Sequence, residues 1–146
     1  MFEMAIPESV NFILKRLSDN GWDGYLVGGC VRDHIMGKTP HDYDVTTPAK
    51  PETVVSLFPD RHVIETGLKH GTVTVVSDGQ PVEITTYRSD GVYLDNRRPE
   101  SVTFVTDLSD DLSRRDFTVN AMAYSPMRGL VDLFGGLEDI KNGVIR

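Results

Sequence analysis

The chain has 146 residues, of which 39% are hydrophobic and 25% charged, a composition typical of one globular domain. The single cysteine excludes a disulfide framework and, with an N-terminus unlike a secretion signal, favours the cytoplasm. The absence of a ~20-residue apolar run argues against a membrane partner. The net charge of −7 argues against a long nucleic-acid interface on this chain, because such surfaces are usually basic.

The first sixty residues predict short helices and strands in alternation. Apolar residues at helical spacing predict a helix over residues 8–20, which Gly21 ends. Residues 24–29 predict a buried strand that runs into a glycine turn. A short helix over 31–37, a strand over 41–47 and a helix over 51–58 follow, the last with Pro51 in its first turn.

The second part predicts a hairpin and then mixed elements. Two β-branched runs over residues 71–88 flank Asp78-Gly79, which is a strong hairpin signal. Residues 101–105 predict a strand, and residues 107–125 predict a helix that carries Phe117, Ala121 and Tyr124 on one face. A strand over 130–134 and a helix over 135–143 complete a mixed sheet. The apolar segment that begins at Val144 leads us to expect the front part of a longer chain.

Two aspartates occupy alternate positions of the strand predicted over residues 41–47. Side chains two apart on a strand share a face, so Asp42 and Asp44 would project together. Carboxylates at this spacing can hold one cation or a pair of them, and oxygen ligands favour Mg²⁺ or Mn²⁺. The alternative is an exposed strand face with two solvated carboxylates, since the pattern is short.

A glycine pair precedes this strand by about a dozen residues. Gly28-Gly29 lies between a strand and a helix, where turn amides can bind a phosphate, and Arg32 adds a fork of donors. The alternative for the glycines is a turn that merely relieves strain. A phosphate cradle next to a carboxylate pair predicts a nucleotidyl-transfer site.

The segment "LVGGCVRDHIMGKTPHDYDVTT" resembles the signature of class II nucleotidyltransferases of the polymerase β superfamily. This group comprises the CCA-adding enzymes and bacterial poly(A) polymerases. Four further blocks match in the expected order: "HGTVTVV", "VEITTYRSDGVYLDNRRPESVTFV", "DDLSRRDFTVNAMAY" and "LVDLFGGLEDIKNGVIR". The resemblance implies an α+β polymerase β-like head, with a mixed, mostly antiparallel sheet and helices packed on one face, over residues 1–146.

The resemblance also implies roles for individual residues. Asp42 and Asp44 would be catalytic and bind two Mg²⁺ ions, or Mn²⁺. Glu83 is either a third catalytic carboxylate or only a polar residue of its strand. The implied nucleotide-binding residues are Gly28, Gly29, Arg32, Arg115, Asp116 and Asn120.

The implied function is addition of CCA to the 3′ end of tRNA from CTP and ATP, with release of pyrophosphate. Poly(A) polymerase activity, addition of only CC or only A, and a non-catalytic nucleotide-binding head remain alternatives. In the family, a neck with a Glu-Asp-x-x-Arg element pairs with the incoming base, and further domains hold the tRNA. No such element occurs before Arg146, so we expect base selection and most of the RNA contact to lie outside this sequence. Arg88, Arg97 and Arg98 flank a loop that is either mobile in function or a plain hairpin connection.

Overall fold

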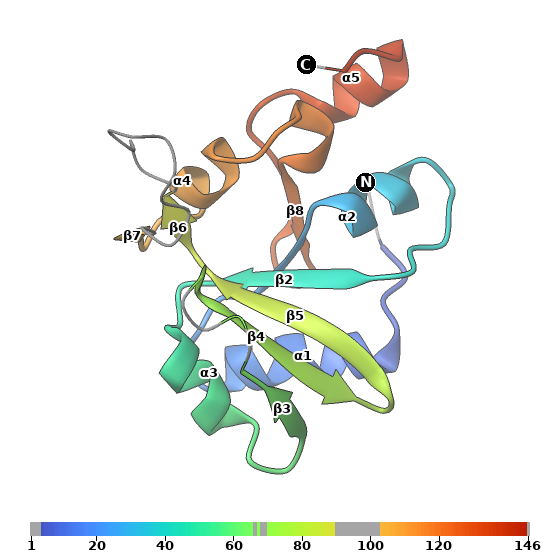
Figure 1. The fold of residues 1–146 in the computed structure, drawn as a ribbon. Coiled ribbons are helices and arrows are strands. Elements are labelled where there is room, and N and C mark those ends of the chain that lie inside the picture. Colours follow the sequence, from blue (N-terminus) through green and yellow to red (C-terminus); the bar gives the residue numbers. More distant parts are fainter. Residues whose placement is uncertain (1–3, 66, 68–69, 90–102, 146) are drawn as a thin grey trace.

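The computed structural model describes residues 4–65, 67, 70–89 and 103–145. These residues form a seven-stranded sheet in the order β3-β4-β5-β2-β1-β8-β9, and a separate two-stranded pair, β6-β7 (Figure 1). The elements are α1 (Glu8–Asp19), β1 (Tyr25–Val27), α2 (Gly29–Ile35), β2 (Tyr43–Thr47), α3 (Pro51–Leu57), β3 (His62–Ile64), β4 (Thr72–Ser77), β5 (Gln80–Thr86), β6 (Arg88–Ser89), β7 (Thr103–Phe104), α4 (Leu108–Ser113), the 3₁₀ turn η2 (Thr118–Asn120), β8 (Met122–Ser125), β9 (Gly129–Asp132) and α5 (Gly136–Asn142).

The sheet is mixed and mostly antiparallel, as predicted. In the described part of the large sheet, β2 and β5 pair in parallel and the other neighbours are antiparallel. The hairpin of β4 and β5 turns at Asp78 and Gly79, whose φ values of 50° and 79° suit a tight two-residue connection. Val73 and Val75 face the core while Thr72 and Thr74 face outward, so one face of the hairpin packs against the core.

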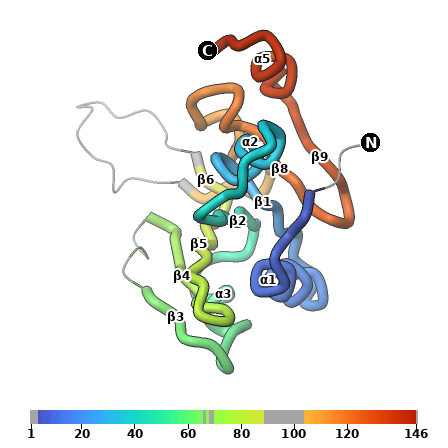
Figure 2. The backbone as a smooth tube through the Cα atoms, turned by 90° about the vertical axis from the view of Figure 1, so that its right-hand side faces the viewer, coloured from blue at the N-terminus to red at the C-terminus, as the bar shows by residue number. Residues whose placement is uncertain are grey.

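The main core lies between the sheet and two helices, α1 and α3. Helix α1 buries Val10, Ile13, Leu14 and Leu17, and α3 contributes Val54 to the same cluster. The side view shows both helices on the same side of β4 and β5 (Figure 2). A smaller cluster lies on the opposite face and comprises Tyr25, Val27, Leu112 and Ala123. Most of that opposite face near β2 and β5 is therefore left to polar residues.

The helix predicted through Phe117, Ala121 and Tyr124 is wrong. Only the turn η2 is helical there, and Met122–Ser125 form β8 between β1 and β9. All four residues of β8 are buried. A strand buried on both faces loses the alternation that distinguishes a strand from a buried helix, which explains the wrong prediction.

Helix α5 is fixed at both ends by local geometry. The Asp132 carboxylate accepts hydrogen bonds from the backbone N–H groups of Gly136 (2.8 Å) and Leu137 (3.0 Å). Gly143 ends the helix in the left-handed conformation, with φ 67°, which glycine adopts without strain.

Across the described ranges, no helix combines the length and apolar character needed to span a membrane.

Candidate nucleotide and metal site

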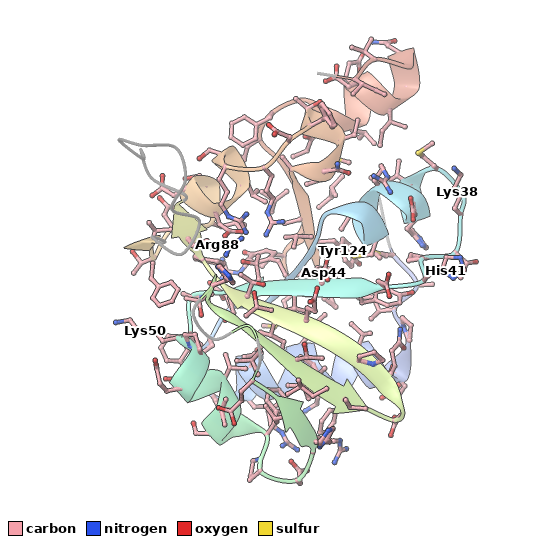
Figure 3. All side chains as sticks on the ribbon, in the orientation of Figure 1. Lys38, His41, Asp44, Lys50, Arg88 and Tyr124 are labelled. Carbon is pink, nitrogen blue, oxygen red and sulfur yellow. The ribbon has the colours of Figure 1, made fainter. Side chains whose placement is uncertain are left out.

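Asp44 and Glu83 are neighbours across the parallel pair of strands. The register of β2 and β5 places Asp44 opposite Glu83, and on its other side Asp44 is opposite Val27 of β1. Asp44 is half-buried and Glu83 is exposed, whereas Val45 next to Asp44 faces the core and is fully buried. Figure 3 shows Asp44 on β2, below α2. The two carboxylates therefore share the face of the sheet that α1 and α3 leave open.

Asp42 lies one residue before β2 and is exposed. The predicted strand over residues 41–47 begins at Tyr43, so His41 and Asp42 are outside its ladder. Asp42 is nonetheless close enough for its charge to raise the pKa of Asp44.

The protonation of Asp44 reflects its crowded surroundings. Burial, together with the charge and hydrogen bonding of Glu83, raises the pKa of Asp44 to about 6. The positive charge of Arg115 acts in the opposite direction, so Arg115 also lies near this carboxylate. A raised carboxyl pKa beside a second acid is typical of functional sites.

The donor chemistry of this face fits a hard divalent cation. Within the residues that the structure describes, no three acidic, histidine or cysteine side chains form a ready-made metal cage. Mg²⁺ does not require one, because it commonly takes one or two carboxylates and completes its shell with water and substrate phosphates. Asp44 and Glu83 repel each other when both are ionised, and a bound cation would offset this electrostatic repulsion.

The glycine turn lies directly beside the carboxylates. Gly28 follows Val27, the partner of Asp44, and takes φ 76°, which favours glycine. A Cβ built on Gly29 would lie 3.2 Å from Nη2 of Arg32, so the guanidinium rests against the turn. The neighbouring Cys30 is buried, and burial raises the pKa of its thiol to about 11. That thiol stays protonated near neutral pH, in keeping with the packing role expected for it.

Arg32 joins the turn to a second segment of the chain. Its Nη1 donates to Oδ1 of Asn120 (2.8 Å), while Nε and Nη2 donate to Oδ1 of Asp33 (3.1 and 3.0 Å). Asn120 Nδ2 in turn donates to the carbonyl oxygen of Asp116 (3.2 Å). Three of the predicted residues, Arg32, Asn120 and Asp116, are thus linked, with the exposed Asp116 contributing its backbone.

Arg115 is held by a residue that the sequence reasoning missed. Asp111 is fully buried, and its Oδ2 accepts from Nη2 of Arg115 (3.1 Å) and from the hydroxyl of Thr46 (3.0 Å). Its Oδ1 accepts from the backbone N–H of Arg88 (3.0 Å) and from Nε of Arg114 (3.4 Å). The signal available in the sequence was an aspartate four residues before Arg115, at helical spacing for an ion pair.

Two of the three arginines expected to flank the loop, Arg97 and Arg98, lie outside the described residues.

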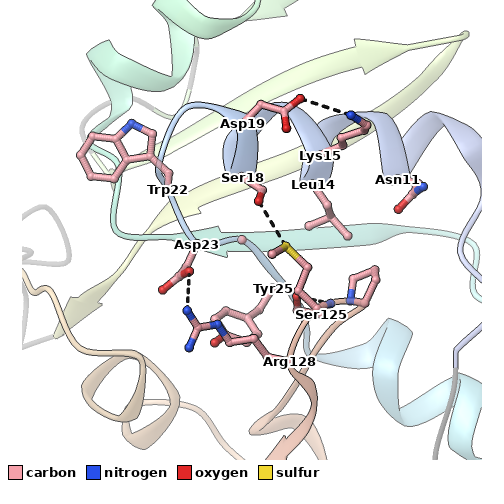
Figure 4. A pocket seen from close by; sticks show the side chains of 13 residues that line it. Asn11, Leu14, Lys15, Ser18, Asp19, Trp22, Asp23, Tyr25, Ser125 and Arg128 are labelled. Carbon is pink, nitrogen blue, oxygen red and sulfur yellow. Dashed lines mark hydrogen bonds and ion pairs between the residues drawn. The ribbon is translucent and has the colours of Figure 1, made fainter.

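Of two pockets in the described part of the chain, one is lined by predicted site residues and the other is not. A groove of about 440 Å³ is lined by Arg32 and Asn120 together with apolar side chains such as Phe117 and Ile145, so it adjoins the glycine turn. A pocket of about 340 Å³ between α1 and the β8–β9 turn contains none of the predicted site residues. Its lining includes Trp22 and an ion pair between Arg128 and Asp23 (Figure 4).

The chain has close relatives among known proteins. A CCA-adding enzyme of Staphylococcus aureus (strain MRSA252) is 47% identical over all 146 residues, which correspond to 35% of that protein. The crystal structure of the Bacillus stearothermophilus CCA-adding enzyme in complex with CTP has a TM-score of 0.84 and 43% identity, over 95% of this chain and 32% of that one. A tRNA nucleotidyltransferase complexed with a primer tRNA and an incoming ATP analog has a TM-score of 0.72 and 30% identity, over 92% of this chain and 38% of that one.

The chain therefore spans about a third of the length of these relatives. The family model described as the poly A polymerase head domain matches residues 24–146, which include the glycine turn, both aspartates and Arg115. On this match and the agreement in fold, the chain belongs to the poly A polymerase head domain family.

Proposed function

We propose that this chain is the nucleotidyl-transferring head of a CCA-adding enzyme, which adds C and A to the 3′ end of tRNA from CTP and ATP and releases pyrophosphate. The observation that carries the proposal is the pairing of Asp44 with Glu83 beside the glycine turn, with Arg115 near Asp44. The 47% identity to a CCA-adding enzyme favours this activity over poly(A) synthesis.

In the proposed reaction, each group of residues has a separate task. Asp42 and Asp44 hold Mg²⁺, with Glu83 available on the adjacent strand. When bound, Mg²⁺ would supply positive charge for the triphosphate and would lower the pKa of the attacking 3′-hydroxyl. Arg115 and Arg32 donate to phosphate oxygens, and the absence of side chains at Gly28 and Gly29 lets a phosphate approach the backbone closely.

Recognition of the base and of most of the tRNA is proposed to involve parts that the longer relatives possess and that this chain does not match. The chain corresponds to 35% of the Staphylococcus relative, and its net charge is −7. An acidic head is a poor surface for a long RNA contact. We therefore expect the head alone to bind CTP and ATP with similar affinity.

Calorimetric titration of the chain with CTP and with ATP, with and without Mg²⁺, tests the proposal. We expect Mg²⁺-dependent binding of both nucleotides, and at least a tenfold loss of affinity in the double variant Asp42→Ala, Asp44→Ala. Val75→Ala, in the core at β4, is the matched control, because it lowers stability without altering the open face. Equal nucleotide affinity in the double variant and the wild type would contradict the metal assignment.

Nucleotide binding should depend on pH in a way that reports Asp44. Because the pKa of Asp44 is raised to about 6, the carboxyl is protonated below that pH and cannot serve as a metal ligand. Mg²⁺-dependent affinity for CTP should therefore fall as the pH drops from about 7 to about 5. Glu83→Gln should move the midpoint to lower pH, because the Glu83 charge is one cause of the raised pKa. The phosphates of CTP titrate identically with both proteins, so a midpoint that does not move in Glu83→Gln would contradict the assigned contact.

A further inference from the structure

Asp111 is a buried carboxylate that joins three separate parts of the fold. Its side chain is fully buried, and its backbone lies in the first turn of α4. The groups that donate to it come from β2 (Thr46), from the first residue of β6 (Arg88) and from the segment after α4 (Arg114 and Arg115). These donors are separated by up to 69 positions in the sequence, between residues 46 and 115. Asp111 therefore fixes contacts that local structure cannot provide.

The contacts of Asp111 are those of an ionised, immobilised carboxylate. A buried charge is costly unless it is paired and its oxygens are hydrogen-bonded. Both oxygens of Asp111 accept two hydrogen bonds within 3.0–3.4 Å, and two of the four donors are guanidinium groups. An arrangement of this kind holds its partners in one geometry.

Arg115 is the partner that faces the open side of the sheet. Its side chain is only 16% exposed and is bound to Asp111 through Nη2, while its charge acts on Asp44. Within the described part of the chain, its Nε is buried without a hydrogen-bond partner, and Nη2 is held by Asp111. The orientation of Arg115 toward the carboxylate pair thus depends on Asp111.

We propose that Asp111 is a positioning residue for the nucleotide site: it holds the Arg115 guanidinium toward the position of the triphosphate and ties it, through Thr46, to the strand that carries Asp44. This inference rests on the proposed function, because it concerns the same nucleotide. Asp111 itself does not touch the substrate and acts through Arg115.

The direction of the effect separates this role from simple electrostatics. Asp111→Asn removes one negative charge near a site for a polyanion, so long-range charge alone would strengthen CTP binding. The asparagine amide keeps only one acceptor oxygen for donors that lie on both sides of Asp111, and it carries no charge for the guanidinium, so Arg115 loses its fixed geometry. We expect about tenfold weaker binding of CTP in Asp111→Asn, since a charge-assisted contact to phosphate depends on alignment. Unchanged or tighter binding in a folded Asp111→Asn variant would overturn the proposal.

A double-mutant cycle tests whether Asp111 acts through Arg115. Arg115→Met should weaken CTP binding, and adding Asp111→Asn to it should cause no further loss. A role in general stability would lower the affinity again in the double variant. Val75→Ala provides a chain of reduced stability whose CTP affinity should equal that of the wild type. If Asp111→Asn fails to fold, Thr46→Val removes one donor without changing charge, and about threefold weaker binding is expected.

A second measurement does not depend on nucleotide binding. In ¹H–¹⁵N spectra, the Nε–H group of Arg115 should give a slowly exchanging signal in the wild type, because the guanidinium is buried and restrained. Asp111→Asn or Thr46→Val should speed its hydrogen exchange severalfold. If the wild type binds no CTP but the exchange changes, the proposed function fails while the positioning contact stands. If CTP binds and neither affinity nor exchange responds to the variants, the positioning role is wrong.

Discussion

Asp44→Asn should make the metal-free protein more stable while removing its Mg²⁺-dependent affinity for CTP. The folded state raises the pKa of Asp44 to about 6, above the usual value of about 3.9. The folded protein therefore binds the proton more tightly than the unfolded chain, and the free energy of unfolding falls as the pH rises from about 4 to about 6. Above pH 6, the ionised Asp44 destabilises the fold, and the neutral asparagine does not.

The expected gain is about 1–2 kcal/mol at pH 7.5, after allowance for the partial exposure of Asp44. This corresponds to a melting temperature about 3–6 °C higher in the presence of EDTA. Thermal unfolding at pH 7.5 and pH 4 provides the measurement, and the difference between variant and wild type should shrink at the lower pH. A variant that is less stable than the wild type at pH 7.5 would contradict the described crowding of Asp44 and Glu83.

Gly136→Ala should be the most destabilising glycine substitution in the described part of the chain. A Cβ at this position would lie 2.3 Å from the carbonyl oxygen of Thr118, and a backbone atom cannot move aside cheaply. The two segments would have to separate, which would disturb the packing of α5 on η2. We expect a loss of about 2–3 kcal/mol, or a melting temperature about 6–10 °C lower.

Gly143→Ala serves as the matched control at the other end of α5. Its φ of 67° strains alanine, but no atom of the described residues lies within 4 Å of the added Cβ. The expected cost is about 1 kcal/mol. Equal melting temperatures for the two variants would show that the contact between Gly136 and Thr118 is looser than described.

Elements set by local patterns were predictable, whereas those decided by distant contacts were not. The hairpin at Asp78-Gly79 and the end of α5 at Gly143 follow from backbone conformations that few residues adopt, and both predictions are confirmed. Strand β8 was predicted as helix because both of its faces are buried, Met122 and Tyr124 in the main core and Ala123 in the smaller cluster, which local periodicity does not reveal.

The site shows the same division. The glycine turn and the aspartate pair stand out in a short stretch of sequence, and so does their order along the chain. The facing of Glu83 was left open, because it depends on a parallel register between strands 39 positions apart, at Asp44 and Glu83. The spacing of Asp111 from Arg115 is visible in the sequence, but the burial of Asp111 and its contacts with Thr46 and Arg88 depend on distant segments and were missed.

The strand order has a consequence for how this protein matures on the ribosome. Strands β1 and β2 are synthesised first, yet both of their outer neighbours in the sheet, β5 and β8, come later. A nascent chain that has emerged only through residue 47 carries Asp44 on β2, whose edge toward β5 is still unpaired, and lacks Glu83 and Arg115. Non-local pairing of this kind closes late in folding, so, on the proposed function, we expect a nascent chain to bind nucleotide only after β8 has been synthesised. The strand order alone would thereby delay completion of the proposed site until most of the chain has been made.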